Sequence, residues 1–79
     1  MYFLYILECF DKTLYTGITL DLKRRVHEHN FSKLGAKYTS SRRPVKLVYF
    51  KKFQSRSLAT SAEMKLKKLS RKEKLELIY

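Results

Sequence analysis

Three segments of the chain have the apolar, aromatic and β-branched residues that are typical of β-strands. We predict strands at Tyr2–Cys9, Leu14–Thr19 and Val45–Phe53. The four residues 10–13 form a turn signal, so the first two strands should pair as an antiparallel hairpin. Alternation in the third strand is impure, which indicates partial cover on both faces, and it places Val45, Leu47 and Tyr49 on the same face.

Helical spacing and capping residues predict three helices. Asp21 is suited to cap a helix over residues 22–30. Apolar residues three and four positions apart predict a second helix, which begins at Ser55 or Ser57 and runs to about residue 69. The run Ser70-Arg71-Lys72-Glu73 is a capping box and opens a short last helix.

The predicted elements follow in the order β-β-α-β-α-α. This order favours an α+β fold, a three-stranded antiparallel sheet flanked by helices. Residues 31–44 have no clean period and contain glycine, proline and four basic residues, so we expect a basic loop there with room for a short turn of helix. Seventy-nine residues correspond to one domain, 1–79, with a thin core.

The net charge of the chain indicates which kind of partner it binds. Eighteen Lys and Arg residues face seven Asp and Glu residues, which gives a net charge of +11. The basic residues are spread along the chain instead of forming a tail, so they predict a broad positive surface. Such a surface favours polyanionic partners, and we expect nucleic acid, most of all DNA.

Cysteine content and hydropathy indicate the cellular compartment in which the protein works. Cys9 is the only cysteine, so an intramolecular disulfide is impossible and a cysteine-based zinc site lacks ligands. We expect a reduced, cytoplasmic protein. The apolar run 2–7 has six residues and is too short to span a membrane, so we expect no membrane partner.

Arg25 and His29 are the residues that point to chemistry. They lie four positions apart on the first predicted helix and therefore share a face. A guanidinium beside an imidazole can grip a phosphate and move a proton. Gly17, inside the preceding strand, marks a bulge or a close approach of the backbone. In so basic a chain this grouping indicates phosphodiester chemistry.

The spacing of the motif residues resembles the GIY-YIG nuclease superfamily over nearly the whole chain. The specific part is the run from Leu14 to Thr19, followed by Asp21, Leu22 and Arg25. The run 35–39 and the sequence Arg42-Arg43-Pro44 resemble the small stand-alone bacterial branch, which is similar to the amino-terminal nuclease domain of the excision-repair endonuclease UvrC.

The resemblance implies a role for each matching position. Tyr5 is similar to the tyrosine of the first motif, and Tyr15-Thr16-Gly17 to the second motif. Arg25 matches the catalytic arginine, and His29 stands where several members carry a functional histidine. Glu63 matches the carboxylate that binds one divalent metal ion. The chain departs from the pattern at Phe3-Leu4-Tyr5, where the first motif's glycine and isoleucine are replaced.

These roles also make chemical sense. Glu63 offers a hard oxygen ligand for Mg²⁺ or Mn²⁺, and Arg25 can bind two phosphate oxygens as a planar fork. Tyr15 or Tyr5 could act as general base if neighbouring positive charges lower its pKa well below 10, and His29 could take that role or hold the water. The residues expected to contact the substrate are Gly17, Lys37, Tyr38, Arg42 and Arg43.

The function that follows is a metal-dependent endonuclease that hydrolyses DNA phosphodiester bonds in repair or recombination. One alternative is a nucleic-acid-binding module with weak or no catalysis. Another is an interaction module whose protein partner supplies specificity and binds the segment 75–79. Each residue taken alone also has an ordinary structural interpretation: the tyrosines as core residues, and Glu63 as a partner of Lys67 one helical turn later.

Overall fold

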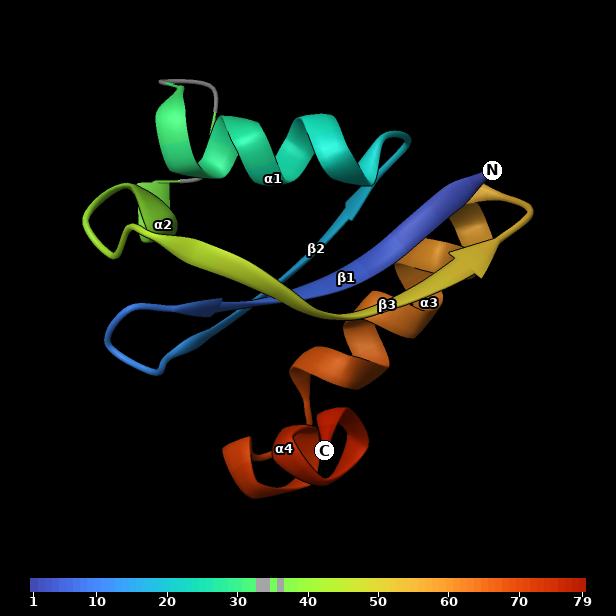
Figure 1. Cartoon of the computed structure of the whole chain (residues 1–79). Coiled ribbons are helices and arrows are strands. Elements are labelled where there is room, and N and C mark those ends of the chain that lie inside the picture. The colour runs from blue at the N-terminus through green and yellow to red at the C-terminus, as the bar shows by residue number, and fades with distance from the viewer. Residues whose placement is uncertain (33–34, 36) are drawn as a thin grey trace.

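The computed structural model describes residues 1–32, 35 and 37–79. Figure 1 shows the elements in chain order, which are β1 (Tyr2–Cys9), β2 (Leu14–Thr19), α1 (Leu22–Phe31), α2 (Lys37–Ser40), β3 (Val45–Phe53), α3 (Arg56–Lys67) and α4 (Arg71–Ile78). The predicted α+β fold is confirmed. The predicted basic loop contains one short helix, α2, and its residues Lys33, Leu34 and Ala36 lie outside the described part.

The sheet is antiparallel throughout, with the order β2-β1-β3. The central strand β1 is paired on both edges, and helices cover both of its faces. Figure 1 shows α1 on one side of the sheet and α3 and α4 on the other. This cover explains why the six residues from Leu4 to Cys9 are all buried.

Two small apolar clusters hold the layers together. Under α1, the buried residues Tyr5, Leu7, Cys9 and Val45 pack with residues of α1 and with Tyr15. On the opposite face the buried residues are Leu4, Ile6 and Leu66. The strand alternation of β1 sends odd-numbered residues to α1 and even-numbered residues to α3.

A β-bulge in β3 corrects one prediction. Ile6 pairs with Tyr49 but the next residue, Leu7, pairs with Leu47, so β3 carries one extra residue there. Val45 therefore packs under α1, whereas Tyr49 packs on the α3 side. The prediction that Val45 and Tyr49 share a face was wrong, because an extra residue reverses the alternation beyond it.

The helix ends follow their capping residues. Asp21 caps α1 by accepting a hydrogen bond from the backbone N–H of Arg24. Ser55, of the two candidates, caps α3, and Ser70 forms the predicted capping box with Glu73. The second predicted helix ends at Lys67, two residues before the expected position.

The side chain of Asn30 joins α1 to β3. Its amide nitrogen donates to the Val45 carbonyl at 3.0 Å, and its amide oxygen accepts from the Val45 N–H at 2.7 Å. The end of α1 is thereby fixed to the start of an edge strand. Within the described residues, no helix is long and apolar enough to cross a membrane.

Candidate active site

The side chains predicted to act together meet between the sheet and α1. Tyr5 and Tyr15 face α1 from neighbouring strands, and their ring centroids lie 6.5 Å apart. His29 reaches both rings, with centroid distances of 5.9 Å to Tyr5 and 5.1 Å to Tyr15. The sheet therefore supplies the tyrosines and α1 supplies the imidazole.

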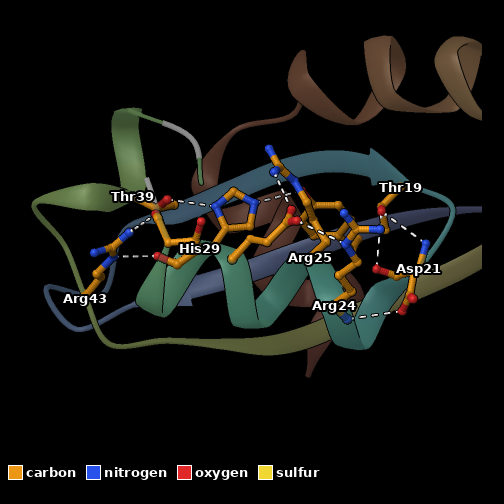
Figure 2. Close-up of polar contacts among 10 residues, drawn as sticks. Thr19, Asp21, Arg24, Arg25, His29, Thr39 and Arg43 are labelled. Carbon is orange, nitrogen blue, oxygen red and sulfur yellow. Dashed lines mark hydrogen bonds and ion pairs between the residues drawn. The ribbon is translucent and has the colours of Figure 1, made fainter. Parts of the chain in front are cut away.

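His29 is fully buried and has a partner at each ring nitrogen. Nε2 lies 2.9 Å from the Tyr5 hydroxyl, and Nδ1 lies 2.8 Å from the Thr39 hydroxyl (Figure 2). Burial lowers the pKa of His29 to about 4, helped by the positive charge of Arg25. The ring is therefore neutral at pH 7, with one N–H, so it donates to one hydroxyl and accepts from the other.

Tyr5 differs from the general base that the sequence suggested. Burial raises its pKa to about 12, although the hydrogen bond from Arg25 acts in the opposite direction. Only 1% of the surface of Tyr5 is exposed to solvent. The expectation that nearby positive charge lowers the pKa fails for Tyr5, because desolvation of the phenolate outweighs it. Tyr15 is less buried and remains the more accessible tyrosine.

Gly17 makes room for the Tyr5 ring. It stands directly opposite Tyr5 in the sheet. A Cβ at this position would lie 2.5 Å from the Tyr5 hydroxyl oxygen and 2.7 Å from the adjacent ring carbon. The close approach predicted at Gly17 is therefore made by the side chain of Tyr5. Its contact with substrate stays a prediction.

Arg25 is held by an acid that the sequence analysis missed. Its Nη1 donates to Glu28 Oε1 at 2.9 Å, and the other Glu28 oxygen accepts from Arg24 Nε at 3.2 Å. Partial burial acts to lower the pKa of Arg25, but the bonds to Glu28 and Tyr5 raise it overall. Arg25 keeps its charge while only 26% of its side chain is exposed. The i, i+3 spacing of Arg25 and Glu28 was the available signal.

Glu63 comes from α3. Its side chain is 19% exposed, and its carboxylate forms an ion pair with Lys67 at 3.4 Å, the ordinary pairing that the sequence allowed. Its negative charge also acts to raise the pKa of the Tyr5 hydroxyl. In the described part of the chain, no three His, Cys, Asp or Glu side chains gather as a metal cluster.

The basic loop adds an aromatic and two arginines. Tyr38 is 40% exposed, and its ring centroid lies 5.8 Å from that of Tyr15. The Arg42 guanidinium lies 4.2 Å above the Tyr38 ring and also pairs with Asp11 at 3.2 Å. Tyr38 is thus held beside the strand tyrosines.

Arg43 and Lys37 are placed differently. Arg43 donates to the carbonyls of His29 and Ser32, each at 2.6 Å, and so closes the end of α1 (Figure 2). Lys37 is exposed at the start of α2. Substrate contacts of Lys37, Arg42 and Arg43 stay predictions.

Comparison with known proteins decides the family. The family model described as the GIY-YIG catalytic domain matches residues 1–76. The chain belongs to the GIY-YIG family. This confirms the resemblance drawn from the spacing of Tyr5, Tyr15, Gly17 and Arg25, and it makes the chain a member of a nuclease domain family.

The similar proteins are small GIY-YIG proteins. A UPF0213 protein from Syntrophus aciditrophicus is 57% identical over 76 residues, which is 96% of this chain and 87% of that protein. The solution structure of the UPF0213 protein BH0048 from Bacillus halodurans has a TM-score of 0.62 and 44% identity, and the match covers 99% of this chain and 83% of that one. The solution structure of EF2693 from E. faecalis has a TM-score of 0.66 and 45% identity, over 96% of this chain and 80% of that one.

Proposed function

We propose that this GIY-YIG protein is a metal-dependent endonuclease that hydrolyses phosphodiester bonds in DNA. The observation that carries the proposal is the constellation beside α1. A charged, restrained Arg25 and the Tyr5 hydroxyl meet next to a buried neutral His29. Glu63 lies within electrostatic range of the same hydroxyl.

Arg25 is suited to bind the phosphate that is attacked. Its guanidinium can donate to two oxygens in one plane, and its partial burial strengthens that interaction. Glu28 holds the guanidinium from one side, so less conformational freedom is lost when the phosphate binds. The charge that develops in the transition state is stabilised most by such preoriented donors.

Tyr15 is the general base that we propose, with Tyr5 and His29 as its support. The buried Tyr5 hydroxyl and His29 ring form a fixed wall against which the Tyr15 ring packs. His29 is neutral at pH 7 and accepts a hydrogen bond at one nitrogen. Thr39 holds its other nitrogen and fixes the ring orientation. We therefore assign His29 to positioning.

Glu63 would hold the metal ion. GIY-YIG nucleases generally use divalent metals. A single carboxylate suits Mg²⁺ or Mn²⁺, which keep several waters and take few protein ligands, and it does not suit zinc. His29 has both nitrogens engaged and is no ligand. When bound, the ion would supply Lewis-acid stabilisation of the phosphate oxygens.

DNA is the proposed substrate because of the surface charge. The net charge of +11 favours a polyanion. Lys37, Tyr38, Arg42 and Arg43 lie on the basic segment beside the tyrosines and are the proposed contacts. We propose a cytoplasmic role in DNA repair or recombination. A small domain of this kind should read the backbone and shape of DNA.

A binding module without catalysis is the second candidate. The observation that favours it is the ion pair between Glu63 and Lys67, which competes with metal for the carboxylate. A third candidate is partner-dependent action. Leu77 and Tyr79 are 45% and 76% exposed, so the end of α4 offers a surface for a protein that supplies specificity.

Metal titration of DNA cleavage distinguishes these candidates. Flaps, forks, nicked and single-stranded DNA are incubated with Mg²⁺ or Mn²⁺, using wild type, Glu63→Gln and Lys67→Gln. A nuclease is expected to cleave with wild type, to lose activity with Glu63→Gln, and to need less metal with Lys67→Gln. Binding without cleavage of any substrate would support the binding module instead.

A further inference from the structure

A hollow of about 210 Å³ lies beside the proposed site, between the start of β2, α2 and α4. Its walls are formed by Thr13, Leu14, Tyr38, Arg71 and Lys74. Tyr38 joins the hollow to the active site, because the centroid of its ring lies 5.8 Å from that of Tyr15. We call this hollow the α4 subsite.

The charged walls of the α4 subsite come from one face of α4. Arg71 and Lys74 are three residues apart and therefore neighbours on the helix. Arg71 donates to the carbonyl of Lys12, which fixes its guanidinium against the turn after β1. A guanidinium has five N–H donors, so others remain for a ligand.

Among the described residues, no carboxylate lines the α4 subsite, although Asp11 lies next to it and accepts a hydrogen bond from the Thr13 hydroxyl at 2.6 Å. The acid nearest in sequence, Glu73, accepts a bond from the Ser70 N–H at 3.0 Å in the capping box. The hollow therefore combines the two positive charges of Arg71 and Lys74 with the ring of Tyr38. This set of donors fits a phosphate.

The other hollows described fit a phosphate less well. The hollow beside Arg25 is also lined by Asp21 and Glu28, and the one at the end of β1 is lined by Glu8. A further hollow between β3 and α3 is lined by lysines but has an apolar floor, and it lies on the sheet face opposite α1. Of these four hollows, the α4 subsite is the one whose lining has two basic side chains, no acidic side chain, and Tyr38.

We propose that the α4 subsite binds a backbone phosphate of the nucleic-acid strand next to the bond that is cleaved. Arg71 and Lys74 make the charge contacts, and Tyr38 forms the wall between this phosphate and the cleavage site. The inference rests on the proposed function and names the path of the substrate: from Arg25, over Tyr38, to α4.

The test is the salt dependence of binding of a single-stranded oligonucleotide, measured in EDTA so that no metal-dependent cleavage occurs. The double variant Arg71→Gln/Lys74→Gln removes the subsite charges. The matched control, Lys51→Gln/Lys65→Gln, removes the same charge from the hollow on the opposite face. Since each phosphate contact contributes about 0.7 to the log–log slope for single strands, loss of this one phosphate contact should reduce the slope by about 0.7.

We expect at least a tenfold weaker Kd for the subsite variant at low salt, with the control changed less than threefold. Arg71→Lys keeps the charge and should retain most of the wild-type slope. Equal weakening by the two double variants would overturn the subsite, and so would an Arg71→Lys variant that binds as weakly as Arg71→Gln/Lys74→Gln. Wild type that shows no salt-dependent binding would overturn the proposed function as well.

Discussion

Acid should destabilise this fold through His29. In the folded protein the pKa of His29 is about 4, against 6.5 for the free side chain. Below pH 6.5 the unfolded chain therefore takes up a proton that the folded protein refuses. Stability rises with pH wherever the unfolded state binds more protons, so it is lost as pH falls from 6.5 toward 4.

The size of the loss follows from the two pKa values. They differ by about 2.5, and each pKa unit corresponds to about 1.4 kcal/mol, so full protonation costs about 3 kcal/mol. The side chain is completely buried, so solvent does little to reduce this cost. Small domains are commonly stable by only about 5 kcal/mol or little more, so the loss is a large share of the total.

Urea unfolding followed by circular dichroism at pH 7 and pH 4.5 measures the effect. Between pH 7 and pH 4.5, the free energy of unfolding should fall more in wild type than in His29→Gln. The difference between the two losses should be most of the roughly 3 kcal/mol that His29 contributes. His27→Gln is the matched control, because His27 lies on the same helix but is exposed. If His29→Gln loses as much stability as wild type, or if the NMR titration of His29 gives a pKa near 6.5, the reasoning is wrong.

Four further predictions concern the site. Gly17→Ala should destabilise the protein by about 1–3 kcal/mol in thermal or urea unfolding, because the new methyl group overlaps the buried ring of Tyr5; unchanged stability would contradict the packing. Glu28→Gln should lower kcat for cleavage about 10- to 100-fold with binding nearly unchanged, because it loosens Arg25, and a pure loss of binding would argue against positioning. Tyr15→Phe should abolish cleavage at alkaline pH, where wild-type activity should rise, and leave stability nearly unchanged. Tyr5→Phe should instead cost stability, since it removes the partner of a buried imidazole nitrogen; full activity of Tyr15→Phe would exclude it as the base.

The local elements of the fold were predictable because their signals are local. Alternation marked the strands, and Asp21 and Ser70 marked helix starts through hydrogen bonds within three residues. The bulge in β3 was not predictable. The bulge is a change of register between β1 and β3: Ile6 pairs with Tyr49, but Leu7 pairs with Leu47. Such a change is visible only once the two strands are paired in the structure.

The site was predictable where the family pattern fixes the spacing. Tyr5, Tyr15 and His29 do meet, as that pattern implied. Thr39 was missed as the second hydrogen-bond partner of His29. It follows a stretch without periodicity, and nothing in the sequence shows that this stretch folds back to bring Thr39 against α1. The direction of the Tyr5 pKa was missed for a related reason: desolvation depends on the completed packing of sheet and helix.

Arg43 shows a different limit. In the sequence it is one of eighteen basic residues and looks available for substrate. In the fold its guanidinium binds two carbonyls at the end of α1, including that of His29. Carbonyl groups left unpaired at a helix end attract such donors, but which arginine reaches them is decided by the loop.

The nicking rate of supercoiled plasmid with Mg²⁺ or Mn²⁺ tests the central claim most directly. Wild type is compared with Arg25→Ala and with Arg24→Ala, because both arginines bind Glu28 but the Arg24 side chain is 73% exposed and that of Arg25 is 26% exposed. We predict metal-dependent nicking that falls about 100- to 1,000-fold in Arg25→Ala and less than threefold in Arg24→Ala. Equal nicking by all three proteins, or none by wild type on any substrate, would contradict the assignment of Arg25 to a nuclease centre.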